Sequence, residues 1–154
     1  MTLRVAAPRD ARALAALISL AYRVEDFFKL GDRTDEADVL ARMQKAAFLV
    51  LEDEDGALAG TVYVDVRGDV GYFGMLSIDP ARQGQGLGSR LIAAAEAHCR
   101  DAGCATMEIE VVNLRTELPP FYERFGYAET ATRPFPDPSR IPCHFIVMQK
   151  SLAA

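Results

Sequence analysis

Three glycines at positions 84, 86 and 88 follow a strand-like run and open an alanine-rich helix. A strand that feeds a glycine turn at the start of a helix leaves several backbone N–H groups unpaired and pointing one way, with the positive end of the helix dipole behind them. Such a turn binds anions, and phosphate in particular. Because glycine lacks a Cβ atom, it lets a phosphate approach the main chain and permits the positive φ angles that a nest of amides needs.

The identity of the phosphate ligand can be narrowed by elimination. A Walker loop ends in Gly-Lys-Ser or Gly-Lys-Thr, and this turn carries no lysine. The dinucleotide fingerprint comes closer, with Glu108 at about the right distance downstream, but it needs glycine or alanine where this chain has Ser89. A dinucleotide-dependent oxidoreductase therefore stays an open alternative, although the hairpins expected before the turn disfavour it.

The run Ile78-x-Pro80-x-x-Gln83-Gly84-Gln85-Gly86-Leu87-Gly88 resembles the signature of the GCN5-related N-acetyltransferase (GNAT) family. In that family an arginine or glutamine followed by Gly-x-Gly-x-Gly or Gly-x-Gly-x-Ala holds the pyrophosphate of acetyl-CoA. The resemblance implies that acetyl-CoA is the acyl donor. It also implies that the pyrophosphate is held by Gln83, Gly84, Gln85, Gly86, Leu87, Gly88 and Ser89.

The same resemblance implies how the pantetheine arm is bound. In the family, two parallel strands splay apart at their C-terminal ends, and the pantetheine lies between them like an added strand. Here the backbone of Leu76, Ser77 and Ile78 would bind its amides, and Asn113 would cap it or order the following loop. Gly74, in the middle of the first of these strands, indicates either a bulge with a close backbone approach or a bulky neighbour.

A second motif, Pro120-Phe-Tyr-Glu-Arg-Phe-Gly-Tyr127, is similar to the aromatic helix of the same family. The resemblance implies that Tyr122 contacts the coenzyme sulfur and acts as general acid, because an O–H donor within reach stabilises a departing thiolate. The alternative is a core aromatic whose hydroxyl reaches the surface. The catalytic interpretation is preferred because Phe121 and Phe125, at helical spacing, already supply a packing face.

An amine acceptor arrives as an ammonium and must lose a proton to a carboxylate, a histidine or a water chain. Glu108 and Glu110 project from one face of a predicted central strand, because side chains two apart share a face. They are either a base with an amine-binding group or a solvated stretch. Glu110 is the preferred catalytic base, since it lies nearer the C-terminal end of the strand, where sites in open α/β sheets are found.

The loop between the first two predicted helices borders the acceptor site in the family. An acidic, aromatic loop suits a cation, and this loop offers candidate substrate-binding residues in Glu25, Asp26, Phe27 and Phe28. A solvated loop with two packing aromatics is an equal alternative. Together with Glu108 and Glu110, these acids predict a negative lining that prefers cationic acceptors.

The elements that must position these residues follow from periodicity and turn signals. We expect strands over Leu3–Ala7, Ala57–Val66, Gly71–Asp79, Ala105–Asn113, Tyr127–Thr132 and Cys143–Lys150, and over Ala47–Gly56 a strand that leads into a tight turn. We expect helices from Asp10 to Arg23, Thr34 to Lys45, Leu87 to Ala102 and Thr116 to Phe125. The order β-α-α-β-β-β-α-β-α-β-β is that of the GNAT family. It implies an α/β (α+β) fold with a mixed sheet, in which an antiparallel N-terminal meander precedes a parallel, splayed strand pair.

Length and composition fit one domain over residues 1–154, with 50% hydrophobic and 25% charged residues. The net charge of −5 disfavours a nucleic-acid partner. No apolar run reaches the roughly 18 residues of a spanning helix, so we expect no membrane partner. Three cysteines and two histidines lack metal-ligand spacing, so no metal site is expected, and a cytoplasmic location is the default.

The sequence therefore predicts an acetyl-CoA-dependent N-acyltransferase that acetylates a primary amine by direct attack. The alternative is a non-catalytic acyl-CoA sensor or regulatory module that kept the cofactor cleft. The acceptor, a small-molecule amine or a protein amine, is left open, and so is a homodimer.

Overall fold

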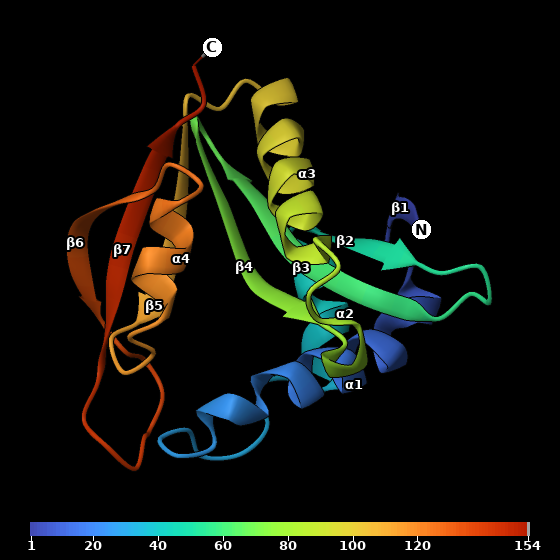
Figure 1. Ribbon diagram of the computed structural model, residues 1–154, viewed down its shortest axis with the longest axis horizontal. Helices are drawn as coiled ribbons and strands as arrows, with labels where there is room; N and C mark the ends of the chain where they lie inside the picture. The colour runs from blue at the N-terminus through green and yellow to red at the C-terminus, as the bar shows by residue number, and fades with distance from the viewer. Residues whose placement is uncertain (154) are drawn as a thin grey trace.

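The computed structural model describes residues 1–153, whose strands form one seven-stranded sheet in the order β1-β2-β3-β4-β5-β7-β6 (Figure 1). The predicted order of elements and the fold class are confirmed. The strands are β1 (Thr2–Val5), β2 (Ala47–Glu52), β3 (Leu58–Arg67), β4 (Val70–Ile78), β5 (Thr106–Val112), β6 (Ala128–Pro134) and β7 (His144–Ser151). The helices are α1 (Ala11–Ala21), α2 (Glu36–Met43), α3 (Leu87–Asp101) and α4 (Leu118–Glu123), with short 3-10 helices η1 (Pro8–Asp10), η2 (Tyr22–Glu25) and η3 (Pro80–Arg82).

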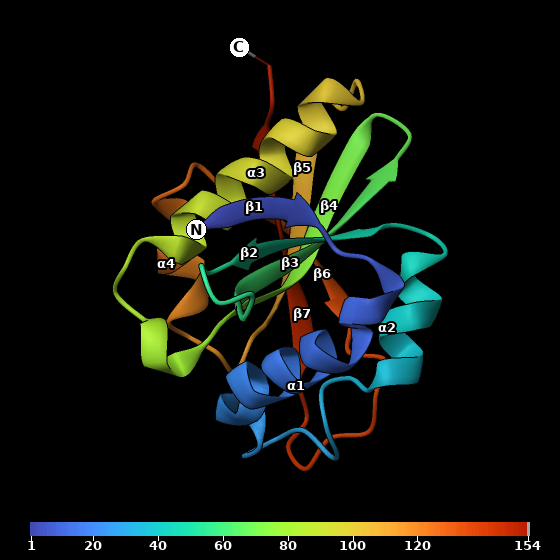
Figure 2. The same cartoon turned by 90° about the vertical axis from the view of Figure 1, so that its right-hand side faces the viewer.

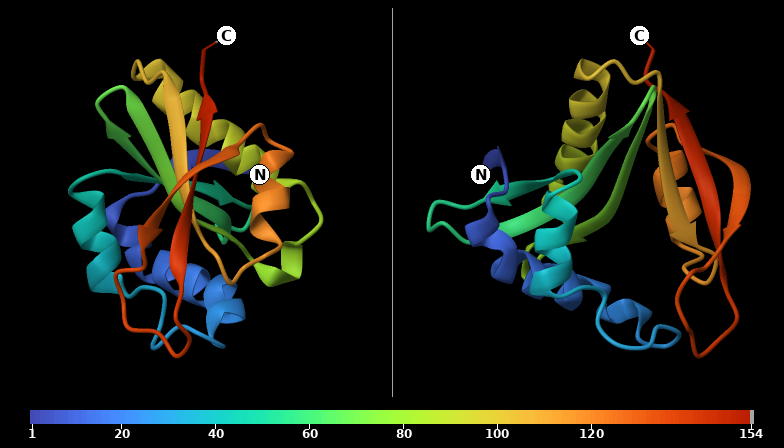
Figure 3. Two further views of the ribbon diagram at one scale, coloured as in Figure 1. Left: turned by 90° about the vertical axis from the view of Figure 1, so that its left-hand side faces the viewer. Right: turned by 180° about the vertical axis from the view of Figure 1, so that it is seen from behind.

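The parallel pair β4 and β5 is joined along only a short stretch. Val70–Tyr72 pair with Thr106–Glu108, and the strands diverge beyond this point, as predicted. The two halves of the sheet form a V in Figure 1, with β1–β4 in one arm and β5, β7 and β6 in the other. Seen from behind, α1 and the loop after it lie beneath the opening (Figure 3, right). Diverging strands leave free backbone edges, to which an extended ligand can add like a strand.

A bulge in β4 decides which side chains face this opening. The register between β3 and β4 shifts beside Tyr63, and Met75 at the bulge has a φ of +53°. An extra residue reverses the alternation of a strand. Met75 therefore packs under α1 and α2, whereas Leu76 and Ile78 pack on the face that α3 covers.

Two apolar layers, one on each face of the sheet, hold these elements in place. Leu91, Ile92 and Cys99 of α3 are buried against one face, and Leu14 and Ile18 of α1 against the other. Figure 2 shows α3 and α1 on opposite sides of β1–β3. The helical spacing of these residues turns an apolar stripe toward the sheet, and each such side chain contributes about 1.5–3 kcal/mol on burial.

The start of α1 differs from the expected arrangement. The carboxylate of Asp10 makes no cap on α1. It accepts a hydrogen bond from the Ala7 N–H at 2.7 Å and pairs with the Arg4 guanidinium at 2.8 Å. Asp10 thus stabilises η1, which leads from β1 into α1, and β1 ends at Val5 instead of Ala7.

The ends of several other helices and strands also differ from the predicted ones by a few residues, and two of these differences have a clear physical cause. The second helix begins at Glu36 instead of Thr34, because Asp35 is its N-cap and accepts a hydrogen bond from the Asp38 N–H at 2.7 Å. β6 continues to Pro134, beyond the expected end at Thr132, because its pairing with β7 extends that far. Neither difference moves the residues around the opening between β4 and β5.

Candidate functional site

Two cavities meet in the opening between β4 and β5. The first, here called the turn cavity, has a volume of about 510 Å³ and follows the glycine turn to the start of α3. The second, the cleft cavity, has a volume of about 280 Å³ and lies between the diverging strands and the loop after α1. Both are lined by Tyr22, Leu76, Leu118 and Tyr122, so ligands in the two cavities can touch each other.

The glycine turn has the backbone that an anion site requires. Gly84 has a φ of +81°, and Gly86, the N-cap of α3, has a φ of +74°, a region that favours glycine. Gly88 has no positive φ, and a Cβ placed on it would meet no protein atom within 4 Å. Neither strain nor crowding within the protein requires glycine at position 88, so the open space beside it suits a ligand that lies close to the main chain.

The other predicted cofactor residues lie at different depths. The turn cavity is lined by most of them, namely Leu76, Ile78, Gln83, Gly84, Gly86, Leu87, Gly88 and Ser89. Ser77 is buried on the opposite face, where its hydroxyl donates to the Met75 carbonyl at 3.0 Å. Gln85 is exposed at the turn and lines neither cavity.

Asn113 is engaged within the protein. Its side-chain oxygen accepts a hydrogen bond from the His144 N–H at 2.9 Å, and its own N–H donates to the His144 carbonyl at the same distance. Asn113 lines neither cavity. Of the two roles expected for it, this geometry favours ordering the end of β5 over capping the pantetheine.

Three arginines of the turn cavity were missed in the sequence. Arg82 pairs with Asp53, Arg115 lies on the loop after β5, and Arg124 is exposed beside the ring of Phe121. Cations here complement a polyphosphate, since charge-assisted hydrogen bonds to phosphate are strong. Two of them, Arg82 and Arg124, lie inside the glycine and aromatic motifs, which is the signal that could have found them.

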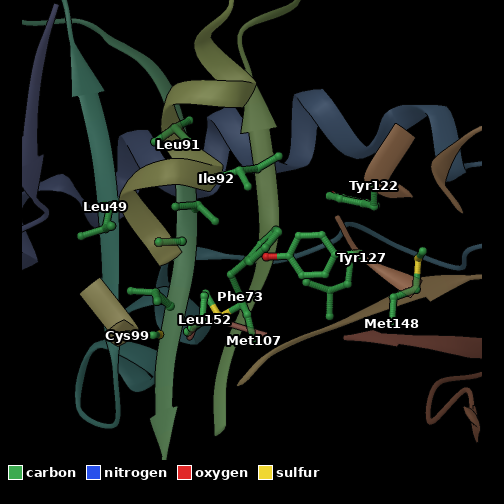
Figure 4. Packing of buried hydrophobic residues seen from close by; sticks show 14 of the residues in the cluster. Leu49, Phe73, Leu91, Ile92, Cys99, Met107, Tyr122, Tyr127, Met148 and Leu152 are labelled. Carbon is green, nitrogen blue, oxygen red and sulfur yellow. The ribbon is translucent and has the colours of Figure 1, made fainter. Parts of the chain in front are cut away.

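Tyr122 lies where the two cavities join. Its ring is 6.0 Å from that of Phe73 and 6.1 Å from that of Tyr127, and Figure 4 shows the three side chains in the core between β4 and α4. The residue is 8% exposed, and burial raises the pKa of its hydroxyl. This hydroxyl makes no hydrogen bond with any residue of 1–153, so it is available as a protonated donor to a ligand.

The cleft cavity carries both signs of charge. Two predicted acids, Glu25 and Glu110, line it together with Asp137. Four cationic side chains line it as well, and none was among the candidates from the sequence: Lys29, Arg33, Arg42 and Arg67. The expectation of a negative lining therefore describes only part of this cavity.

Glu108 and Glu110 project from one face of β5 but have different surroundings. Glu108 accepts hydrogen bonds from Arg133 at 2.8 Å and from Gln149 at 2.9 Å, and the bond from Arg133 is the main cause of its lowered pKa. Glu110 lies 3.4 Å from the same guanidinium and lines the cleft cavity, which Glu108 does not. The strand thus offers one carboxylate to the cavity and holds the other in the sheet.

Glu25 lies deep in the cleft, on η2. Burial raises the pKa of its carboxyl, and the guanidinium of Arg115 at 3.0 Å opposes this shift. Because Arg115 lines the turn cavity, this ion pair crosses the junction of the two cavities.

The other predicted residues of this loop do not reach the cleft. Asp26 and Phe27 are exposed, the latter by 50%. Phe28 is buried, with its ring centroid 6.1 Å from that of Phe135. All three line neither cavity, which corresponds to the packing alternative for this loop.

The position of the Tyr72 ring in the cleft explains why residue 74, in the middle of β4, is a glycine. A Cβ on Gly74 would lie 2.7 Å from the hydroxyl oxygen of Tyr72, so the glycine admits this ring, while the bulge follows at Met75. Burial raises the pKa of Tyr72 to about 12, and the guanidinium carbon of Arg67 lies 4.2 Å from its ring centroid. Both alternatives for Gly74, a bulge and a bulky neighbour, thus hold at adjacent residues.

Within residues 1–153, no three or more His, Cys, Asp or Glu side chains gather as a metal ion would need. In the same part of the chain, every helix is too short or too polar to span a bilayer.

The fold, the glycine turn and the paired cavities agree with those expected for an acyltransferase, and comparison with known proteins identifies the family. The model of the acetyltransferase (GNAT) family matches residues 13–127, so the chain belongs to this family. It is an acetyl-CoA-dependent N-acyltransferase, with acetyl-CoA as the acyl donor.

Relatives with established names cover parts of the chain. Blasticidin-S acetyltransferase of Streptomyces morookaense is 38% identical over 98 residues, which are 62% of this chain and 69% of that protein. A mycothiol acetyltransferase of Cellulomonas flavigena is 31% identical over 73% of this chain and 37% of its own length. Glucosamine 6-phosphate N-acetyltransferase 1 of Oryza sativa is 34% identical over 54% and 55% of the two chains. The matched residues thus span between about a third and two thirds of these relatives.

Solved structures share the fold over the whole chain. The ribosomal-protein-S18-alanine N-acetyltransferase of Escherichia coli superposes with a TM-score of 0.77 at 20% identity, covering 99% of this chain and 94% of that one. The structure of yncA from Salmonella typhimurium with its cofactor acetyl-CoA has a TM-score of 0.76 at 21% identity, covering 100% and 95%.

Proposed function

We propose that this chain transfers the acetyl group of acetyl-CoA directly to a small-molecule primary amine bound in the cleft cavity. The observation that carries the proposal is the junction of the two cavities at Tyr22, Leu76, Leu118 and Tyr122. An acyl donor in the turn cavity and an amine in the cleft cavity would meet there in contact distance, so no covalent relay through the protein is needed.

The turn cavity fits the acyl donor. The main chain of Gly84, Gly86 and Gly88 would hold the pyrophosphate, with Arg82 and Arg124 beside it. The free edge of β4 at Leu76 and Ile78 would bind the pantetheine in the manner of an added strand. Acetyl-CoA supplies a thioester, whose carbonyl carbon accepts the amine.

Tyr122 and Glu110 are the proposed acid and base. Glu110 would take the proton of the ammonium, directly or through water, so that the free amine attacks. As the carbon–sulfur bond breaks, the hydroxyl of Tyr122 would donate its proton to the sulfur. The acetyl group would end on nitrogen as an amide, and coenzyme A would leave as the thiol. The second proton that the nitrogen loses would restore the hydroxyl of Tyr122, directly or through water, and Glu110 would release its proton to solvent.

A small-molecule acceptor is supported by the enclosure of the cleft cavity. Its volume of about 280 Å³ is near the lower end for ligand pockets. Relatives named for blasticidin-S and for glucosamine 6-phosphate are in agreement. The free thiols Cys99, Cys104 and Cys143 support a reducing, cytoplasmic compartment.

The test is a panel of primary amines assayed for thiol release in the presence of acetyl-CoA, with the acetylated amine identified by mass. We expect at least one small amine to be acetylated. Calorimetric titration with acetyl-CoA accompanies the assay, because a chain that binds acetyl-CoA tightly and acetylates no amine would instead be an acyl-CoA sensor.

A further inference from the structure

The cleft cavity has two chemically different ends. Its inner end joins the turn cavity at Tyr22 and Tyr122, where the thioester would lie. Its outer end opens into a surface hollow of about 620 Å³, and three cations line both: Lys29, Arg33 and Arg42. Four aspartates also line the hollow, namely Asp32, Asp35, Asp38 and Asp137. An acceptor that reaches the thioester with one end therefore has its other end at this charged rim.

The rim is held by two loops that lie side by side beneath the opening of the V (Figures 1 and 3). Lys29 lies on the loop after η2 and forms a β-bridge with Ser139 of the loop between β6 and β7, and the Arg140 N–H donates to the Phe28 carbonyl at 2.7 Å. These contacts fix the backbone of both loops, so the cations stand at defined places on the rim.

Two of the three cations lack a strong anionic partner. The side chain of Lys29 is only 10% exposed, yet its nearest carboxylate oxygen, on the 60% exposed Asp137, lies 3.8 Å away. No carboxylate in residues 1–153 lies within 4 Å of Arg33, whose guanidinium carbon sits 5.1 Å over the ring of Tyr22. Arg42, by contrast, is bound to Asp38 at 3.1 Å.

The ammonium of Lys29 is largely withdrawn from water, and its only compensation from residues 1–153 is the carboxylate of Asp137 at 3.8 Å and the ring of Phe135 at 5.9 Å. A charge that loses hydration without a close hydrogen-bonded partner is unfavourable. An anion at the rim would supply that partner and could accept further hydrogen bonds from Arg33, which makes none with the residues the structure describes. Of the four aspartates that line the hollow, Asp35 caps α2 and Asp38 pairs with Arg42, which leaves Asp32 and Asp137 beside Lys29 and Arg33.

We propose that the natural acceptor is an amine that also carries an anionic group, a carboxylate or a phosphate. The amine points inward to Glu110 and the junction at Tyr122, and the anionic group is bound at the outer rim by Lys29 and Arg33. This inference rests on the proposed function and adds a class of substrate to it. The expected preference for cationic acceptors then applies to the inner end alone.

The experiment compares matched pairs of acceptors by kcat/KM: O-phosphoethanolamine with ethanolamine, and 4-aminobutyrate with butylamine. We expect the anionic member to be favoured in at least one pair, and the two pairs distinguish phosphate from carboxylate. Arg33→Met should reduce that preference, taken as the ratio of kcat/KM within each pair, about 10-fold by removing a charge-assisted hydrogen bond. Lys29→Met should act in the same direction.

Two variants serve as matched controls. Arg12→Met removes an exposed arginine of α1, and Lys45→Met removes an exposed lysine after α2; neither residue lines the cleft cavity. Both should leave the preference unchanged. If Lys29→Met fails to fold because its side chain is largely buried, the half-buried Arg33→Met variant still tests the preference for the anionic acceptor.

Calorimetry with O-phosphoethanolamine separates this inference from the proposed function. Equal turnover of both members of each pair, with no effect of Arg33→Met, would overturn the anionic acceptor and leave the acetyltransferase intact. Binding of O-phosphoethanolamine that depends on Arg33, without acetylation of any amine, would support the anion site and overturn the proposed function. Neither binding nor turnover of any anionic amine would overturn the inference.

Discussion

The glycine turn and the cleft cavity are built in opposite ways. The glycine turn is one continuous stretch of the turn cavity, from Arg82 to Ser89, and it offers a ligand its main chain. The cleft cavity gathers side chains from η2, α2, α4, four strands and two loops. A site made of contiguous backbone keeps its chemistry through a local pattern of glycines, whereas a site made of converging side chains can change its ligand through single substitutions.

In the proposed reaction this difference separates the donor from the acceptor. The acyl donor would contact a part of the protein that the fold itself imposes, the free edge of β4 and the N-terminus of α3. The acceptor would contact Lys29, Arg33 and Glu110, which no element of the fold requires. Substitutions in the turn cavity should therefore affect every acceptor equally, and those in the cleft cavity should depend on the acceptor.

The largest effect is expected for Gly86→Asp, in the turn cavity. The variant places a carboxylate beside the bound pyrophosphate, and repulsion between unit charges about 4 Å apart near a protein surface is about 4 kcal/mol. The affinity for acetyl-CoA should fall on the order of 1,000-fold in a calorimetric titration, and the loss of activity should be the same for every acceptor.

Gly68→Asp is the matched control for this experiment. Gly68 has a φ of +68°, close to the +74° of Gly86, and a Cβ on it also meets nothing within 4 Å, but it lies in the turn between β3 and β4. Similar losses of affinity in both variants would indicate backbone strain instead of charge, and the turn would lose its assignment as the pyrophosphate site.

The next effect is expected at the junction of the two cavities. Tyr122→Phe keeps the ring and its packing on Phe73 but removes the hydroxyl, so kcat should fall on the order of 100-fold with little change in acetyl-CoA affinity. Burial raises the pKa of Tyr122 above its ordinary value of 10, so the hydroxyl keeps its proton through the neutral range. The alkaline limb of the pH–rate profile should therefore not arise from Tyr122.

Tyr22→Phe provides the comparison, because Tyr22 lines both cavities as well. Removing the hydroxyl of Tyr22 should have a much smaller effect on the rate of acetyl transfer than removing that of Tyr122. Both variants are compared under single-turnover conditions, so that product release does not mask the chemical step. A larger loss in Tyr22→Phe than in Tyr122→Phe would transfer the role of general acid to Tyr22.

How far the sequence could be interpreted follows the same contrast between the cavities. The order of the elements followed from strand and helix periodicity, the glycine turn from its local pattern, and the splayed pair from the family resemblance. The start of the first helix differs from the expected one because Asp10 pairs with Arg4 and does not cap α1. This pairing is a tertiary contact, which the periodicity of the sequence does not encode.

Most of the side chains that line the cleft cavity could not be predicted from the sequence, for a different physical reason. Its cations lie far apart in the chain, at Lys29, Arg33, Arg42 and Arg67, and an exposed arginine has no distinguishing pattern. The net charge of −5 does not indicate where cations gather in the fold. The acids on β5 were found through their strand period, but the period cannot tell which one Arg133 holds.

Glu110→Gln should give the third effect, about 10-fold on kcat at neutral pH. The substitution keeps the shape of the side chain and removes its basicity, while water can still remove part of the ammonium proton. Turnover should recover as the pH rises and free amine becomes available, measured as a pH–rate profile for one acceptor. A loss of equal size at every pH would make Glu110 a structural carboxylate.

The smallest effect concerns Glu108, two residues earlier on β5. Glu108→Gln should leave turnover nearly unchanged, because the carboxylate is bound by Arg133 and Gln149 and does not line the cleft cavity. It should lower the free energy of unfolding by about 1 kcal/mol at neutral pH, as expected for a partly exposed ion pair. A loss of turnover as large as in Glu110→Gln would place Glu108 in the acceptor site.

The pH dependence of that stability difference gives the sharper test of Glu108. Its pKa in the folded state is lowered below the ordinary 4.5, chiefly by the hydrogen bond from Arg133, so the unfolded chain binds its proton first as the pH falls. The contribution of Glu108 is therefore complete well above pH 4.5 and is lost as the pH falls through the lowered pKa. Urea unfolding of wild type and Glu108→Gln should differ at neutral pH and converge toward about pH 3. A difference that stayed constant with pH would mean that the variant acts through lost packing, and that Glu108 and Arg133 form no stabilising ion pair.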